Sequence, residues 1–234
     1  MLQTILNQVL PSQCLLCQAK VNQVLPLCAA CKDELPWNHQ ACHHCGKHIE
    51  SKEQTICGHC ITSPPNYDRV FTAFKYETPI NAWVSSMKFF DQWQFSKILG
   101  LLFAEKLIKT LKPTNHPDLI IPVPLHPKRI TKRGFNQALE IAKPISRAFK
   151  IPLDYHSIKR IKNTLAQSEL DKPTRDRNLK NAFHIRKAIK AKHIAIVDDV
   201  ATTGNTIQAV TDILKKHGVE RVDVWVCTRA HFHY

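Results

Sequence analysis

The chain has 234 residues, 44% of them hydrophobic, and a formal net charge of +14 at pH 7. This length predicts one globular domain with a small added module, or two small domains, and the hydrophobic content is ordinary for a protein with a buried core. No apolar run is long enough to span a bilayer, and residues 1–11 lack the basic head and the cleavage site of a secretory signal. We therefore expect a cytoplasmic protein. The apolar residues within 1–11 fit one face of a short helix.

Eight of the nine cysteines form four Cys-x-x-Cys pairs near the start of the chain. The pairs are Cys14/Cys17, Cys28/Cys31, Cys42/Cys45 and Cys57/Cys60. A Cys-x-x-Cys turn presents two thiolates to one metal ion, so two turns complete a tetrahedral four-sulfur site. The eight thiolates predict two closed, structural Zn²⁺ sites in a segment with few apolar residues of its own. Iron–sulfur clusters and redox thiols are the alternatives.

The spacing alone leaves the pairing of the four turns open. Sequential pairing would give two consecutive zinc ribbons, which we expect, and pairing of the first turn with the third would give a cross-braced unit. Nearby histidines could also bind metal, although eight Cys already satisfy two ions: His39, His43, His44, His48 and His59. A reducing compartment argues against disulfides. Cys227 stands alone in a later strand-like stretch, where we expect a buried small hydrophobe.

A turn signal at residues 63–66 separates this Cys-rich segment from the rest of the chain. We therefore predict a double zinc-ribbon module over residues 1–62 and a second domain over residues 63–234. In the second domain, apolar patterns predict strands over 70–76, 119–123, 193–197 and 222–227, and helices over 79–90, 98–111, 135–149 and 206–217. Strands that alternate with helices predict an α/β fold with a mostly parallel sheet flanked by helices.

The most specific pattern runs from Ile194 to Thr206. A strand of four apolar residues leads into Asp198 and Asp199, then a threonine-rich turn with Gly204, then a helix. Open α/β sheets bind ligands at the carboxyl ends of their strands. Free N–H groups at the helix start, the hydroxyls and the glycine predict a cup for a phosphate monoester. The carboxylates suit a ribose diol or Mg²⁺. An Asp-Asp turn with a threonine N-cap is the structural alternative, and the sequence contains no P-loop.

This pattern resembles the phosphoribosyl-pyrophosphate motif of the type I phosphoribosyltransferases. The resemblance implies a phosphoribosyltransferase-like fold that binds phosphoribosyl pyrophosphate, as ligand or substrate, together with Mg²⁺. It implies that Asp198 and Asp199 contact the ribose hydroxyls. It also implies that the following turn holds the 5′-phosphate through Ala201, Thr202, Thr203, Gly204, Asn205 and Thr206.

Positive charge is concentrated between Lys128 and Lys192, where 18 Lys or Arg face five Asp or Glu, so this segment carries +13 of the formal charge. Such a field attracts polyanions such as pyrophosphate, nucleic acid or an acidic membrane face. Lys128 and Arg129 are candidate ligand-binding residues, and Arg133 is a candidate catalytic residue that would stabilise a leaving pyrophosphate. The polar stretch over residues 160–178 is either a lid or an ordinary solvated loop.

A second resemblance involves the pentapeptide Arg133-Gly134-Phe135-Asn136-Gln137, which follows a Pro-Val-Pro strand, and the later stretch over residues 177–183. Both resemble the competence protein F (ComF) family, in which a four-pair Cys module precedes a phosphoribosyltransferase-like domain. This resemblance covers essentially the whole chain. It implies a cytoplasmic role in natural transformation, handling incoming single-stranded DNA, with competence-machinery proteins as partners.

Three functions stay open at this point. The chain is a DNA-handling factor with phosphoribosyl pyrophosphate as ligand or regulator, an active phosphoribosyltransferase on an unidentified nucleophile, or a zinc-dependent interaction module with a vestigial sugar-phosphate site. Binding of single-stranded DNA would combine phosphate contacts with aromatic stacking. Five aromatic residues are candidates, although we expect most of them in the core: Trp37, Trp83, Phe89, Phe90 and Trp93.

Overall fold

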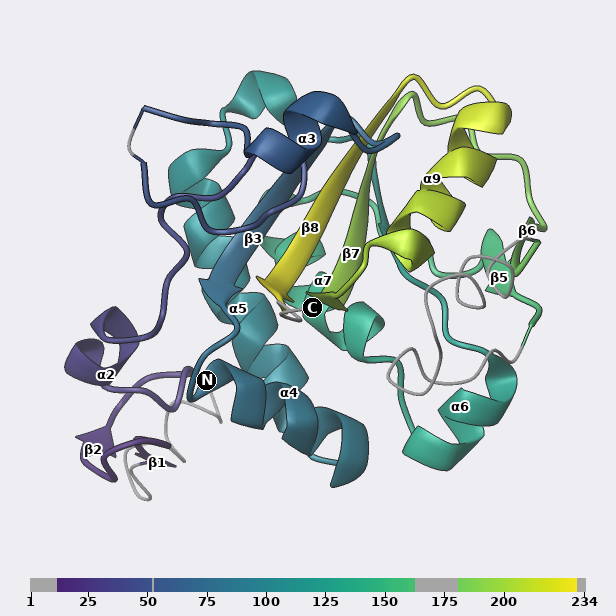
Figure 1. Cartoon of the computed structure of the whole chain (residues 1–234). Helices are drawn as coiled ribbons and strands as arrows, with labels where there is room; N and C mark the ends of the chain where they lie inside the picture. The colour runs from purple at the N-terminus through teal and green to yellow at the C-terminus, as the bar shows by residue number, and fades with distance from the viewer. Residues whose placement is uncertain (1–11, 52, 163–180, 231–234) are drawn as a thin grey trace.

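The computed structural model describes residues 12–51, 53–162 and 181–230 of the chain (Figure 1). The helix expected within residues 1–11 lies outside these ranges. So do residues 163–178 of the suggested lid and residues 177–180 of the second ComF-like stretch.

A parallel sheet of four strands forms the centre of the molecule. Its order is β3 (Arg69–Lys75), β8 (Arg221–Arg229), β7 (His193–Ala201) and β4 (Leu119–Pro122). The expected mostly parallel sheet is confirmed. β7 and β8 are the two central strands and pair from His193/Arg221 to Ala201/Arg229. Their sequences are nearly continuous apolar runs because helices cover both faces.

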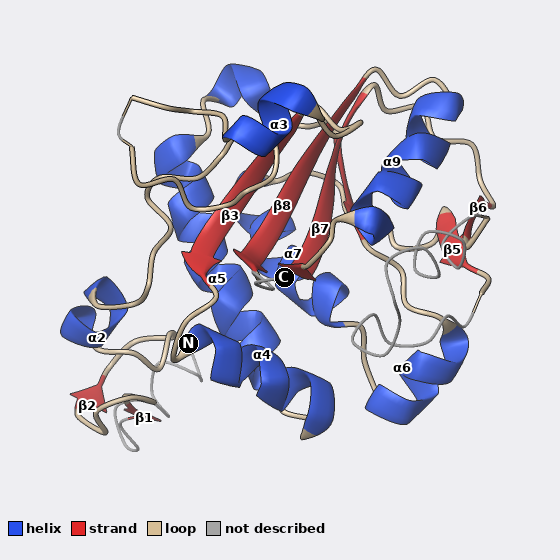
Figure 2. Ribbon diagram, viewed as in Figure 1, coloured by secondary structure: helices blue, strands red, loops and turns tan. Residues whose placement is uncertain are grey.

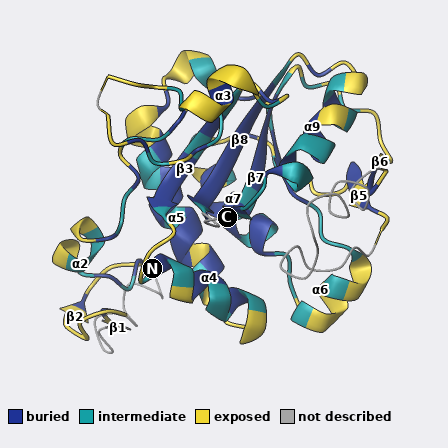
Figure 3. Cartoon of the chain, viewed as in Figure 1, coloured by how far each residue is buried: buried dark blue, intermediate teal, exposed yellow. Residues whose placement is uncertain are grey.

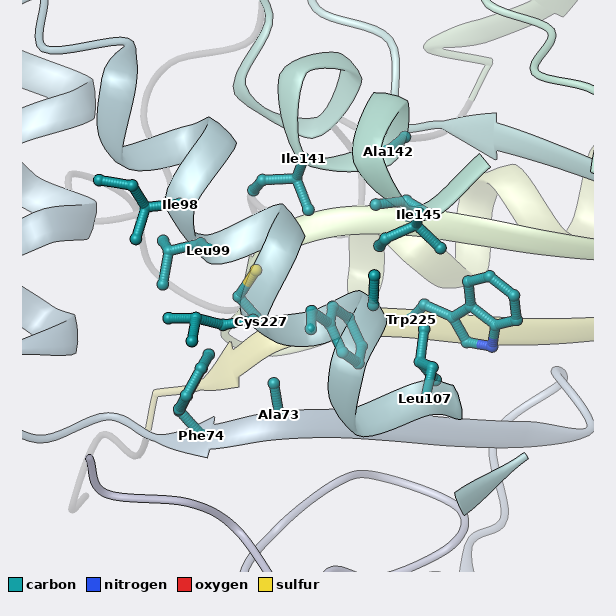
Figure 4. Close-up of a cluster of buried hydrophobic side chains, with 14 of the residues drawn as sticks. Ala73, Phe74, Ile98, Leu99, Leu107, Ile141, Ala142, Ile145, Trp225 and Cys227 are labelled. Atoms are coloured by element: carbon teal, nitrogen blue, oxygen red, sulfur yellow. The ribbon is translucent and has the colours of Figure 1, made fainter. Parts of the chain in front are cut away.

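Helices cover the two faces of the sheet unequally (Figure 2). α4 (Ile80–Phe89), α5 (Gln94–Thr110) and α7 (Gln137–Phe149) form one layer, and α9 (Asn205–Lys216) lies on the opposite face. Successive strand residues point to opposite faces, so Trp225 and Cys227 contribute to the core under α5 and α7 (Figure 4). Cys227 is fully buried, which confirms the expectation for this residue.

Close packing of α5 against α7 depends on Gly100. A Cβ atom at this position would lie only 2.5 Å from the carbonyl oxygen of Ile141 on α7. The apolar stripe of α7 can therefore lie directly against α5, where Leu99, Ile141 and Ile145 share one core (Figure 4). Figure 3 shows the resulting arrangement, with buried strands between helices whose outer sides are exposed.

Within its described residues, the Cys-rich segment contains short elements only: β1 (Ser12–Gln13), β2 (Lys20–Val21), α2 (Ala29–Asp33) and α3 (Gly58–Thr62). Its middle part follows the outer edge of β3. The N–H of Asn38 donates to the carbonyl oxygen of Ala73 (3.0 Å), and the N–H of Lys75 donates to that of Pro36 (2.8 Å). This segment therefore covers a sheet edge that would otherwise present unpaired backbone groups.

Several elements differ from the sequence-based expectations. β7 continues through Ala201, four residues beyond the predicted end, because Asp198, Val200 and Ala201 pair with β8. The two acids therefore belong to the last part of a strand rather than to a loop. The short helix α6 (Pro127–Arg133), the 3₁₀ turn η1 (Pro113–Asn115) and the hairpin of β5 (Ile158–Arg160) and β6 (Phe183–Ile185) were not expected. None of these is long enough to show a clear hydrophobic period.

Within the described ranges, none of the helices combines the length and the apolarity needed to cross a bilayer.

Candidate functional site

The eight cysteines form two separate clusters. Cys14, Cys17, Cys28 and Cys31 form one, and Cys42, Cys45, Cys57 and Cys60 form the other, with all sulfur atoms of a cluster within 4.8 Å of one another. The first turn pairs with the second and the third with the fourth, which confirms the sequential arrangement. In Figure 1, α2 of the first cluster and α3 of the second lie at opposite ends of β3.

The sulfur positions fit zinc. Sγ of Cys17 lies 3.7 Å from Sγ of Cys28, and Sγ of Cys45 lies 3.6 Å from Sγ of Cys57. A tetrahedron with Zn–S bonds of about 2.3 Å has edges of about 3.8 Å, whereas a disulfide would bring the sulfurs to about 2.05 Å. Four sulfurs close each site and leave no position for a substrate, so both sites are structural.

Backbone donors support the sulfur clusters. Cys28 and Cys57 are the N-caps of α2 and α3. The N–H of Cys31 points to Sγ of Cys28 at 3.5 Å, and the N–H of Cys57 points to Sγ of Cys42 at 3.3 Å. Such contacts stabilise thiolate charge, which the four-sulfur set needs in order to bind a divalent ion.

The acidic pair lies at the carboxyl end of β7, where neighbouring side chains alternate in direction. Asp199 is buried, and its Oδ2 lies 2.9 Å from Nζ of Lys88 in the last turn of α4. Burial alone would raise the pKa of Asp199. The charge and hydrogen bond of Lys88 more than offset this effect and hold that pKa below the ordinary carboxyl value. Asp199 is therefore an ionised carboxylate that is already paired with the ammonium group of Lys88.

Asp198 lies in a different environment. Burial, followed by the neighbouring charge of Asp199, raises the pKa of Asp198 well above its ordinary value. Beside it lies a small cavity of about 30 Å³ at the start of α9. The strand end, the turn and the first turn of α9 line this cavity through Asp198, Val200, Ala201, Thr202, Gly204, Thr206 and Ile207. The structure thus brings together Asp198 and most of the turn that the sequence singled out.

Gly204 is the N-cap of α9 and has φ +83°, a conformation that favours glycine. A Cβ at this position would lie 3.5 Å from Nη1 of Arg229, at the end of β8. That distance is an ordinary van der Waals contact, so the positive φ rather than a lack of space favours glycine, and the guanidinium of Arg229 lies close to the turn. Of the two other predicted turn residues, Asn205 directs its N–H to the hydroxyl of Thr203 at 3.5 Å. Neither residue lines the small cavity.

Arg160 lies within electrostatic reach of Asp198, and Arg129 lies within electrostatic reach of Arg160. Arg160 on β5 is buried, and its guanidinium lies 5.5 Å from the ring centre of Phe183. Burial, and then the charge of Arg129, lowers the pKa of Arg160 to about 10, while the charge of Asp198 acts in the opposite direction. Arg129, a predicted ligand-binding residue on α6, is thus close enough to Arg160 for their charges to interact. Lys128 precedes it on the exposed side of the same helix.

Arg133 lines a different pocket, between the α4–α5 turn and the α6–α7 turn. Its Nη1 donates to Oε1 of Gln137 at 3.0 Å. The pocket has a volume of about 580 Å³ and is lined by Asp91, Trp93, Thr131, Lys132, Arg133, Gly134, Phe135 and Glu140. A catalytic role for Arg133 stays a prediction.

Sequence reasoning missed three cations at the strand ends: Lys88, Arg160 and Arg229. A lysine in the last turn of a helix is common and usually solvated, so Lys88 carried no distinguishing signal. Arg160 was considered only as the start of the suggested lid.

The expectation that most of the five aromatic candidates lie in the core was wrong. Trp37 and Trp83 pack against Phe74 and Phe95, whereas the remaining three are exposed: Phe89, Phe90 and Trp93.

Comparison with known sequences gives two domain matches. Residues 5–61 match the double zinc ribbon domain, and residues 135–231 match the phosphoribosyl transferase domain. Competence protein F of Haemophilus influenzae is 34% identical over 209 residues, which cover 87% of this chain and 90% of the relative. The DNA utilization protein YhgH of Escherichia coli O157:H7 is 32% identical over 205 residues, with the same coverage.

Two solved structures are also similar. A purine phosphoribosyltransferase from Pyrococcus horikoshii has 21% identity and a TM-score of 0.35, covering 59% of this chain and 84% of that one. A hypoxanthine phosphoribosyltransferase from Staphylococcus aureus has 10% identity and a TM-score of 0.35, covering 59% of this chain and 74% of that one.

Proposed function

The chain belongs to the competence protein F family, and from this premise we propose that it binds phosphoribosyl pyrophosphate with Mg²⁺ and handles single-stranded DNA. The printed names of its relatives refer to competence and to DNA utilization. We extend these roles to this chain, with a cytoplasmic location and competence-machinery proteins as further partners. We also propose that residues 1–62 and 63–234 are its two domains.

One observation supports the ligand proposal most directly: Asp198 borders a cavity that the turn and the first turn of α9 also line. A phosphate monoester offers only acceptors, which match the backbone N–H groups at the start of a helix and the hydroxyls of Thr202 and Thr206. The ribose diol offers donors, which match a carboxylate. Mg²⁺ takes one or two carboxylates and keeps several waters. Arg129 and Arg160 add positive charge on the same side, where a diphosphate would need it.

Calorimetric titration of phosphoribosyl pyrophosphate with Mg²⁺ tests this proposal. Wild type should release heat of binding, and Asp198→Ala combined with Asp199→Ala should remove it. Glu220→Ala is the matched control, since Glu220 is an exposed acid paired only with exposed Lys192 among the described residues. Equal binding by wild type and the double variant would place the ligand elsewhere.

The DNA half of the proposal rests on the excess of +13 between Lys128 and Lys192. Contacts between cations and phosphates release counterions, so affinity for single-stranded DNA should fall steeply as salt rises. Affinity that does not change with salt, or no binding at low salt, would contradict this half while leaving the ligand half intact.

The match to the phosphoribosyl transferase domain favours a second candidate, an active phosphoribosyltransferase on an unidentified nucleophile. Pyrophosphate release in the presence of phosphoribosyl pyrophosphate and Mg²⁺, dependent on an added acceptor, would support it. Binding without release describes a regulatory ligand instead.

A further inference from the structure

The pocket beside Arg133 differs from the small cavity at the acidic pair in size and in lining. At about 580 Å³ it falls within the range of pockets that hold small organic ligands. Trp93 and Phe135 supply aromatic surface, and Lys132 and Arg133 supply positive charge. Asp91 and Glu140 add carboxylates. This mixture of one π surface, two cations and two acids restricts the chemistry of the ligand.

Three exposed aromatic residues occur at the α4–α5 turn, and one of them, Trp93, lines this pocket. Phe89 is 74% exposed, Phe90 71% and Trp93 54%. We call these three residues the aromatic corner. Asp91, between them, adopts a left-handed backbone with φ 53° that aspartate tolerates better than most residues. Large exposed aromatic side chains next to one another are costly in water and usually indicate a contact surface.

The pocket wall is anchored firmly to the neighbouring helix. Gln137, at the start of α7, is 2% exposed, and its Nε2 donates to the carbonyl oxygen of Met87 on α4 at 3.3 Å. Its Oε1 accepts the hydrogen bond of Arg133. One buried amide therefore fixes the guanidinium with respect to the end of α4, where the aromatic corner begins.

The lining fits a nucleotide better than a free diphosphate. A densely charged sugar diphosphate would meet the carboxylates of Asp91 and Glu140 as well as the two cations. A nucleotide within a strand carries one phosphodiester charge, a π face and N–H donors at the base edge. These groups match Lys132 and Arg133, the aromatic rings, and the carboxylates, which accept from exocyclic amino groups.

We propose that this pocket binds one nucleotide of single-stranded DNA, and that the aromatic corner stacks the adjoining bases. The proposal rests on the DNA half of the proposed function and assigns it a place. The aromatic corner begins at the same end of α4 that reaches the acidic pair, because Lys88, which contacts Asp199, immediately precedes Phe89. Of the other tryptophans, Trp83 and Trp225 are buried and Trp37 is half-buried against Phe74, so a base that stacks on Trp93 would act on the exposed indole.

Binding of a labelled oligothymidylate, followed by fluorescence anisotropy, tests the proposal. Trp93→Ala combined with Phe89→Ser should raise the Kd at least about tenfold, since each base that stacks on an aromatic ring contributes to affinity. Lys132→Glu should weaken binding and reduce the salt slope by about one unit. Tyr155→Ala is the matched control, because Tyr155 is an aromatic residue, 49% exposed, that does not line the pocket. Zinc content and circular dichroism should stay at wild-type values for every variant.

A second readout uses tryptophan emission. The oligonucleotide should quench the emission of wild type, and Trp93→Phe should lose most of this quenching while it retains affinity. The inference is overturned if the double aromatic variant binds within twofold of wild type, or if duplex DNA or RNA of the same sequence binds ten times more tightly. If wild type binds no DNA, the DNA half of the proposed function fails as well. Calorimetry with phosphoribosyl pyrophosphate should be unchanged in the aromatic variants, which separates the two sites.

Discussion

Lys88 of α4 contacts Asp199 of β7 at 2.9 Å, whereas Asp198, one residue earlier, borders the cavity at the start of α9. The two acids therefore have different surroundings although they are neighbours in the sequence. Asp199 is matched by a cation of the protein itself. Asp198 has the raised pKa and the access to the cavity that a ligand-contacting group would show.

Lys88→Met should leave Asp199 buried beside Asp198 without its cation. We expect a loss of about 2 kcal/mol in the free energy of unfolding, which is less than the roughly 3–5 kcal/mol for a fully enclosed pair because Lys88 is 28% exposed. The folded pKa of Asp199 is depressed, so its contribution is present above the unfolded value of about 3.9 and is lost as pH falls through the folded value. Urea midpoints of wild type and variant should therefore converge below about pH 4. The exposed Lys97→Met should match wild type throughout.

The sequential pairing of the Cys turns predicts how zinc is lost. Cys14 and Cys28 belong to one cluster. Replacing both by Ser should therefore remove one ion and leave the other cluster loaded, so zinc content should fall from two ions per chain to one. The matched variant replaces Cys14 and Cys42, which belong to different clusters, and it should lose both ions. A reversed result would indicate interleaved pairing in solution.

Local patterns predicted the parts of this protein that depend on neighbours in the sequence. Each Cys-x-x-Cys turn fixes two ligands by itself. The apolar run before Asp198 indicates a buried strand, and ligands bind at the carboxyl ends of the strands in open α/β sheets. The partner of Asp199 could not be predicted in this way, because Lys88 reaches it from a helix more than a hundred residues earlier. The same holds for Arg160, whose proximity to Asp198 depends on how the β5–β6 hairpin packs.

The end of β7 shows a further limit of sequence reasoning. Asp has low strand propensity, so the sequence predicts a loop from Asp198 onward. Pairing with β8 overrides this preference, because the backbone of β8 provides hydrogen-bonding partners for β7 as far as the pair Ala201/Arg229. Tertiary pairing thus lengthened the strand, and the acids alternate across it as strand residues.

The opposite end of the sheet contains a buried charge network that we expect to be important for stability. Asp223 is fully buried, and Arg221 contacts both of its oxygens at 3.1 Å, while Nε2 of His193 lies 3.1 Å from Oδ2. Asp223→Asn replaces one acceptor by a donor that faces the guanidinium. We expect a loss of about 3 kcal/mol in chemical denaturation. Glu220→Gln, at a nearby exposed pair, should change stability by less than about 0.5 kcal/mol.

Lys106 connects the Cys-rich segment to the sheet and should give stability an alkaline pH dependence. Its Nζ donates to the carbonyl oxygens of Asn38 (2.5 Å) and Ala73 (2.9 Å). Burial lowers the pKa of Lys106 to about 8, compared with about 10.4 in the unfolded chain. Between these two values the unfolded chain binds more protons than the folded one. This group therefore makes the protein more stable as pH rises from about 8 to 10.4.

Lys106→Met should remove this pH dependence. Below pH 8 the variant avoids the cost of a buried ammonium but removes the lysine donor from two carbonyl groups, of which that of Ala73 keeps the N–H of Asn38, so the two effects oppose each other. The informative quantity is the slope of the difference in unfolding free energy, which should favour wild type increasingly between pH 8 and 10. The exposed Lys109→Met, on the same helix, supplies the reference slope. Parallel curves for wild type and Lys106→Met would mean that Lys106 stays charged in the folded protein up to the usual lysine range.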